Sequence, residues 1–204
     1  NGHALSADVV VSSTDVGARL ITKASTSYYP AVMYSGAGAP TISASVIKDV
    51  LYAIPFTPPD SATLDQIAMW VGAVSIGGHV AYGVCSDSGG VPGTILCQGS
   101  SSLNVSAGTM VTTTVSQALV PGTRYWFIMV FDAAAQTSSV TVWGITKTLL
   151  QAYKGYDGTT TTGHPVGLSV AYSYASTIVL PSFAGATVLS SNTTFVPMGW
   201  VRYS

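Results

Sequence analysis

The sequence predicts an all-β fold, an antiparallel β-sandwich that follows a short N-terminal arm. Three observations lead to this prediction. Short apolar runs recur about every 8 to 14 residues between clusters of Gly, Pro and Ser, which is the spacing of strands in a sandwich. The chain has no Glu and few Lys, so two good helix formers are scarce. One run, Tyr125–Phe131, is apolar on both of its faces.

The chain carries little charge. Charged residues make up 7% of its 204 residues, against about 25% in ordinary soluble domains, and the net charge is -1. Such a surface must be rich in hydroxyl groups or buried between subunits to keep the chain dispersed. The same balance disfavours nucleic acid as a partner. Gly, Pro, Ser and Thr break the uncharged stretches, so neither a transmembrane helix nor membrane insertion is expected. Residues 1–20 also lack the basic start and apolar core of a signal peptide.

The expected fold is organised around the strand Tyr125–Phe131. It follows the turn signal Val120-Pro121-Gly122-Thr123 and is too short for a helix that buries both sides. Its side chains alternate between two apolar faces, which are Tyr125, Phe127, Met129 and Phe131 on one side and Trp126, Ile128 and Val130 on the other. Both faces need cover. The strand therefore lies centrally in a sandwich or against a partner chain.

Three parts are expected along the chain. Residues 1–22 form a shaft-like arm, because their single short strand signal cannot build a core. Residues 23–46 are rich in Ser, Ala and Gly and form a connector with one short strand. Residues 47–204 form the sandwich, with a long turn over 87–93. The expected strands of the sandwich are 50–56, 64–74, 79–85, 94–98, 109–118, 124–131, 139–146, 170–179 and 194–203.

Residues 147–172 have the weakest strand signal and contain the predicted binding site. Loops of this length in compact domains are commonly functional or disordered. A sugar site needs an exposed aromatic ring for the C–H face of the sugar and polar side chains for its hydroxyls. This mixture is supplied by Tyr153, Lys154, Tyr156, Asp157 and His164. In the alternative interpretation the tyrosines fasten the loop to its own domain, Asp157 belongs to a turn and His164 is solvated.

No catalytic or cofactor motif stands out, and the chain is expected not to be an enzyme. A glycosidase needs two nearby carboxylates, but Asp60 and Asp65 flank one strand start and are interpreted as turn residues. The histidines and cysteines lack metal-site spacing. Asp87 could help to hold Ca²⁺, although a plain turn role is the simpler interpretation. No cofactor and no metal are therefore expected.

Cys85 and Cys97 are the two cysteines of the sequence, so at most one disulfide can form. Two free and buried thiols are expected, because two cysteines make no disulfide framework. An oxidised pair is the alternative, and it would suit a secreted protein.

The first eighteen residues contain an ordered motif. Asn-Gly-His-Ala-Leu-Ser-Ala-Asp-Val at 1–9 is followed by Asp15-Val16-Gly17-Ala18. Together they resemble the repeated shaft motif of tailed-bacteriophage tail fibres, which precedes a distal domain. The shaft motif often continues with Leu-Gly-Asn-Val, whereas Arg19-Leu20-Ile21 follows here, which fits a change into a tip domain.

A second resemblance covers the segment from Tyr52 to Asp132. It is similar to a jelly-roll module common in carbohydrate-binding and surface-attachment proteins. The features that carry it are Phe56-Thr57-Pro58, Ala62-Thr63-Leu64-Asp65, Tyr82 to Asp87 with Gly90-Val91-Pro92-Gly93, and Leu119 to Trp126. This likeness implies a fold more than a ligand.

The fibre resemblance implies a function. Those fibres are trimers whose tips bind the host surface, so the chain is expected to be a homotrimeric receptor-binding tip in the virion, assembled in the host cytoplasm. Its partner would be a polysaccharide or an outer-membrane protein of a bacterium. Two other functions stay open: a structural virion component without a receptor, and a carbohydrate-binding module of a secreted bacterial protein. A fibre-borne depolymerase is a further, enzymatic alternative.

Overall fold

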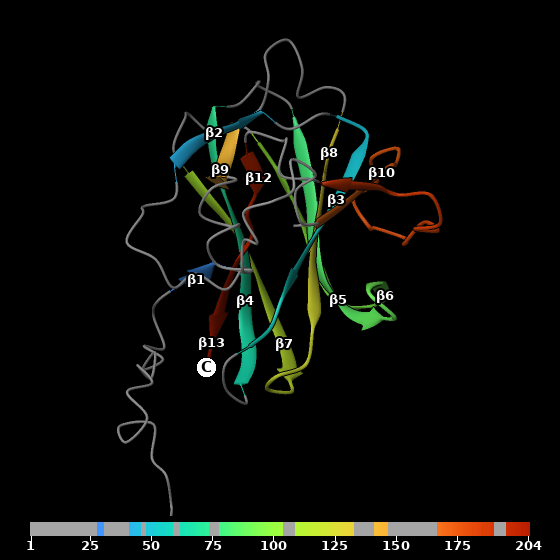
Figure 1. Ribbon diagram of the computed structural model, residues 1–204. Coiled ribbons are helices and arrows are strands. Elements are labelled where there is room, and N and C mark those ends of the chain that lie inside the picture. The colour runs from blue at the N-terminus through green and yellow to red at the C-terminus, as the bar shows by residue number, and fades with distance from the viewer. Residues whose placement is uncertain are drawn as a thin grey trace, which may run out of the picture.

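The computed structural model describes residues 28–30, 41–45, 48–58, 62–73, 78–103, 109–132, 141–146, 167–189 and 195–204. Within these residues every regular element is a β-strand, and every strand pair is antiparallel. The strands form two sheets that pack against each other (Figure 1). The predicted antiparallel β-sandwich is therefore confirmed. In the described part of the chain no helix is long and apolar enough to cross a membrane.

The first sheet, sheet A, is centred on one long strand. Its members are β1 (Tyr28–Pro30), β2 (Thr41–Ser45), β4 (Ala62–Ala73), β7 (Thr109–Leu119), β9 (Thr141–Thr146), β12 (Phe195–Pro197) and β13 (Trp200–Tyr203). Strand β4 pairs with β7 along one side, and with β13 and then β9 along the other. Strands β1, β2 and β12 extend the sheet from β13 and β9.

The second sheet, sheet B, has six strands in a simple order. From one edge to the other they are β11 (Thr187–Leu189), β10 (Gly167–Ala171), β3 (Val50–Phe56), β8 (Tyr125–Phe131), β5 (His79–Ser88) and β6 (Val91–Ser102). Strand β8 thus lies between β3 and β5, as its two apolar faces require. All seven of its side chains are buried.

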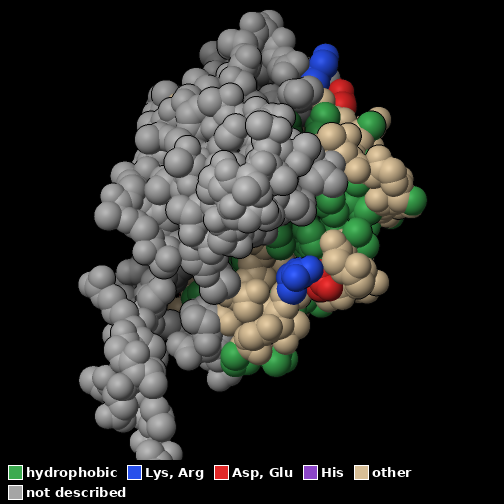
Figure 2. Space-filling view, in the orientation of Figure 1, with side chains coloured by type: hydrophobic (Ala, Val, Ile, Leu, Met, Phe, Trp, Pro, Cys, Tyr) green, Lys and Arg blue, Asp and Glu red, His purple; other side chains and the backbone are tan. Residues whose placement is uncertain are grey.

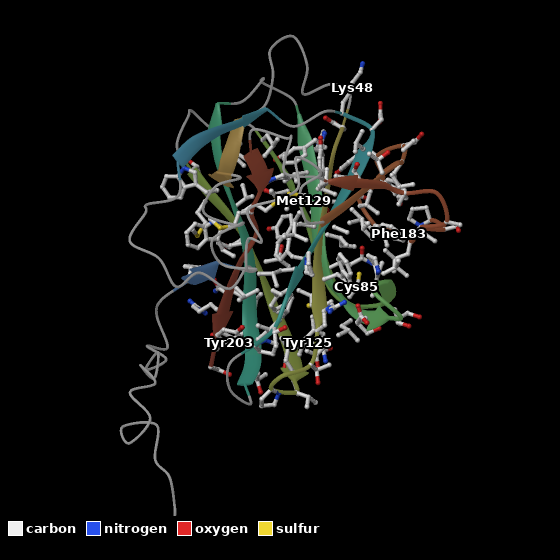
Figure 3. All side chains as sticks on the ribbon, viewed as in Figure 1. Lys48, Cys85, Tyr125, Met129, Phe183 and Tyr203 are labelled. Carbon is white, nitrogen blue, oxygen red and sulfur yellow. The ribbon has the colours of Figure 1, made fainter. Side chains whose placement is uncertain are left out.

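The core lies between the two sheets. The β8 side chains Tyr125, Phe127, Met129 and Phe131 belong to one buried cluster with Leu64, Ile67 and Met69 of β4 (Figure 3). The rings of Tyr82 and Phe127 stack in it with centroids 6.4 Å apart. Because each strand alternates inward and outward side chains, two facing sheets bury the apolar side chains that lie between them.

The opposite face of sheet B is also buried. Trp126, Ile128 and Val130 of β8 form a second cluster, which residues 172–183 cover. We name residues 172–183 the strap. They follow β10 on the side of sheet B away from sheet A (Figure 1). The second apolar face of β8 is thus covered within the chain, so it does not require a partner chain.

Three predicted segments are wrong in detail. The expected strand 194–203 is two strands, β12 and β13, with Met198 and Gly199 between them. The expected strand 170–179 ends at Ala171, and the strap follows instead. The expected long turn over 87–93 is a two-residue hairpin, because Ser88 pairs directly with Val91. Gly89 and Gly90 have φ values of 63° and 93°, as a type I′ hairpin turn requires.

The structure describes only part of the N-terminal arm and connector. Residues 1–22, the predicted arm, lie outside the described residues. The connector at 23–46 contains two described strands, β1 and β2, where one short strand was expected. Both pair with strands of sheet A, so this segment contributes to the sandwich.

Candidate functional site

The predicted loop site cannot be placed. Tyr153, Lys154, Tyr156, Asp157 and His164 all lie outside the described residues. Their role in binding stays a prediction. The same combination of residue types, an aromatic ring beside His and Asp, also occurs elsewhere in the described chain and forms a candidate site.

That site is built on a histidine–aspartate pair at one end of sheet B. His79 begins β5, and Asp132 directly follows β8, the antiparallel neighbour of β5. Asp132 Oδ2 lies 2.7 Å from His79 Nδ1, and Asp132 Oδ1 accepts from the main-chain N–H of His79 at 3.0 Å. In return, the Asp132 N–H donates to the His79 carbonyl at 3.1 Å. Three hydrogen bonds between these two residues thus hold the imidazole ring in place.

The third member is an aromatic ring from the strap. The ring of Tyr174 lies 6.0 Å from the His79 ring, centroid to centroid, at an interplanar angle of 31°. Asp49 holds this part of the strap: its carbonyl accepts from Tyr172 N–H at 2.9 Å, and its Oδ1 accepts from Tyr174 N–H at 3.3 Å. Asp49 adopts φ 53°, a left-handed conformation that Asp tolerates better than most residues. We name His79, Asp132, Tyr174 and Asp49 the rim cluster.

The rim cluster is both anchored and accessible. The His79 side chain is 47% exposed and that of Asp132 is 12% exposed. Partial burial, and then the charge of Asp132, raise the pKa of Tyr174, so its phenol stays neutral at ordinary pH. Exposed Ser102 of β6 is the register partner of His79, so the two side chains project from the same face of sheet B. An imidazole, a carboxylate and an aromatic ring therefore meet where β5, the end of β8 and the strap come together.

Sequence patterns alone did not bring these residues together. The histidines match no metal-ligand spacing, and Asp132 simply follows the apolar run Tyr125–Phe131. The useful signal was positional: one residue starts a strand after Gly77-Gly78, and the other ends a strand. Neighbouring antiparallel strands place such ends side by side, so a correct pairing of β5 with β8 would have revealed the cluster.

Asp87, which was considered as a Ca²⁺ ligand, instead stabilises the hairpin between β5 and β6. Asp87 Oδ2 accepts from Gly90 N–H at 3.1 Å, and Asp87 Oδ1 accepts from Trp126 Nε1 at 2.7 Å. Both oxygens are thus occupied by protein donors, which supports the turn role. Within the described residues no three His, Cys, Asp or Glu side chains gather as a metal site would require.

Asp65 is not a turn residue, contrary to the prediction. It lies inside β4, at a register shift between Leu64 and Gln66. Its carboxylate accepts from Arg202 of β13 at both Nε and Nη2, with the Nη2–Oδ2 distance at 2.8 Å. The bulge turns the carboxylate toward the neighbouring strand, where a two-point ion pair forms. Asp60 lies outside the described residues.

No protein-family model matches the chain, and no curated protein matches it.

Proposed function

We propose that the chain is the receptor-binding tip of a tailed-phage tail fibre, which attaches to a polysaccharide or protein on a bacterial surface. Two observations support this. Residues 1–18 resemble the shaft motif that precedes such tips. The described chain is a β-sandwich, a rigid scaffold on which many unrelated binding sites are built.

The observation that carries the proposal is the rim cluster. A surface glycan offers hydroxyl groups and apolar C–H faces, and His79, Asp132 and Tyr174 offer the complementary groups within one small area. The cluster lies where strand ends and the strap meet, so its ring positions are fixed before a ligand arrives. Preorganised groups lose little conformational entropy on binding.

Assembly as a homotrimer is part of the proposal. It rests on the fibre resemblance and on the low charge of the chain. The double apolar face of β8 no longer supports it, because the strap buries that face. Three copies of a weak site would raise the avidity for a repetitive surface without any new contact.

The test combines mass and cell binding. Light scattering on a sizing column gives the mass of the purified chain, and a fluorescent fusion is then incubated with a panel of bacterial strains. A mass three times that of the chain together with binding to some strains supports the proposal. A monomer that binds none of them overturns it, and a trimer that binds none favours a purely structural virion component.

A further inference from the structure

The geometry of the rim cluster assigns a hydrogen-bonding role to each imidazole nitrogen of His79. An ionised carboxylate only accepts hydrogen bonds, so Nδ1, at 2.7 Å from Asp132 Oδ2, carries the proton when the ring is neutral. Nε2 then holds a lone pair. Each hydrogen bond of His79 within the described residues uses Nδ1 or the main chain, and 47% of the side chain is exposed. The free acceptor at Nε2 suits a ligand hydroxyl.

The surroundings of Nε2 suit the rest of a sugar. Tyr174 presents a half-buried ring 6.0 Å from the imidazole, on which a C–H face can pack. Ser102, the register partner of His79 on β6, adds an exposed hydroxyl that can donate or accept. The two rings are close enough for one monosaccharide to contact both.

The charge of this end of the molecule disfavours anions. Its described charged groups are Asp132 after β8, and Lys48 and Asp49 ahead of β3, so carboxylates outnumber cations. Tyr172 and Tyr174 are its titratable strap residues, and Ser100, Ser101 and Ser102 of β6 carry no charge. Figure 3 shows Lys48 extending away from the sandwich at this end. Among the described residues on the face shown in Figure 2, charged side chains form isolated spots among hydrophobic and uncharged polar atoms.

We propose that the rim cluster binds a neutral glycan, one of whose hydroxyls donates to Nε2 of His79 while the sugar packs on Tyr174, and that it rejects glycans bearing uronic acids. This deepens the proposed function and rests on it. A uronate would place a third carboxylate beside Asp132 and Asp49, and like charges in a partly buried site repel.

The experiment uses an array of neutral hexose and deoxyhexose oligosaccharides, each beside a version in which one sugar is a uronic acid. Affinities of the full chain for the array members are then measured. We expect neutral members alone to bind, with about tenfold weaker binding in His79→Ala. Tyr174→Phe should bind nearly as the parent and Tyr174→Ala should not. Arg124→Ala, an exposed cation at the opposite end of β8, is the matched control and should change nothing.

The outcomes distinguish failure of the neutral-glycan site from failure of the proposed function. Equal binding of uronate members, or binding that His79→Ala leaves unchanged, overturns the neutral-glycan site. Binding to cells without binding to any array member also overturns it, and leaves a protein receptor as the partner in the proposed function. If His79→Ala fails to fold, the comparison of Tyr174→Phe with Tyr174→Ala gives the decision, and equal binding by these two variants overturns the site.

Discussion

Cys85 and Cys97 lie on neighbouring strands of sheet B but on opposite faces of that sheet. Cys85 belongs to the buried cluster under the strap, whereas Cys97 packs against the core between the sheets. Val84 pairs with Cys97 and Cys85 pairs with Ile95, so an extra residue in β6 separates the two registers. A disulfide would have to pass one side chain through the sheet. Both cysteines are accordingly free, as expected, although Cys97 is half-buried rather than buried.

The first prediction concerns the reactivity of these thiols. Burial raises the pKa of Cys85 to about 12 and that of Cys97 to about 11, so both remain protonated at neutral pH. Because the thiolate is the reactive form, alkylation by iodoacetamide should be slow in the folded chain and fast in guanidinium. Mass spectrometry of the two reactions checks this. Cys97 should react before Cys85, and a disulfide in the non-reduced native chain would contradict the assignment.

The second prediction concerns the strap. Ile178 is 1% exposed within the cluster that contains Trp126, and its N–H donates to Gln98 Oε1 at 2.7 Å. Ile178→Ala keeps that main-chain bond but removes buried apolar volume, so it should lower the free energy of unfolding by about 2–4 kcal/mol. Urea denaturation measures this change.

The adjacent residue supplies the control for the strap. Val179 is 73% exposed. Val179→Ala should alter the free energy of unfolding by less than about 0.5 kcal/mol, because the Val179 side chain buries little surface in the folded chain. If both variants lost the same stability, the strap would not be a specific cover for sheet B.

The sequence predicted most of the sandwich because period-2 patterns and Gly/Pro punctuation are local signals. Strand β3 begins and ends at the expected residues, and β8 alternates between two buried faces as its composition required. The strap was not predictable in the same way. Its N–H groups donate to the side chains of Asp49 and Gln98, which are 125 and 80 residues away. No local pattern contains such partners, so residues after Ala171 resembled more strand.

The rim cluster contains residue types that were expected for a sugar site, but at another place in the chain. An aromatic ring beside Asp and His was the expected combination, and the rim cluster has it. Sequence proximity selected a loop, whereas His79 and Asp132 are 53 residues apart and meet only through strand register. The predicted loop residues, from Tyr153 to His164, lie outside the described residues, so their role stays a prediction.

The third prediction concerns the hairpin between β5 and β6. Asp87 accepts from Trp126 Nε1 and from Gly90 N–H, and so joins the turn to the central strand β8. Asp87→Ala leaves a buried indole N–H without its acceptor, which should lower the free energy of unfolding by about 1–3 kcal/mol. Equilibrium unfolding in urea provides the value.

A variant of the nearby cation Arg124 distinguishes loss of the Trp126 hydrogen bond from loss of an ion pair. Arg124 Nη1 is 4.0 Å from Asp87 Oδ1, and the Arg124 side chain is 56% exposed. Exposed ion pairs contribute about 0–1 kcal/mol, so Arg124→Ala should cost far less than Asp87→Ala. Equal losses would assign the role of Asp87 to the ion pair and not to the indole.

The last prediction is a loss of stability in alkali. Burial raises the pKa of Cys85 to about 12, of Cys97 to about 11 and of Tyr203 to about 12, and it also raises the pKa of Tyr82. The folded chain therefore holds these protons at pH values where the unfolded chain releases them. Stability falls with rising pH wherever the folded state binds more protons. It should be constant up to about pH 9 and decrease from there to about pH 12.

Single substitutions can separate the contributions to this loss. Tyr203→Phe and Cys85→Ala each remove one titrating group, so the free energy of unfolding should decline less steeply above about pH 9 than in the parent. Val179→Ala, which removes no titrating group, should reproduce the parent slope. Thermal or urea unfolding at constant ionic strength measures all four profiles. A parent profile that stays flat to about pH 12, or slopes unaffected by either substitution, would show that these buried groups do not hold their protons as their surroundings require.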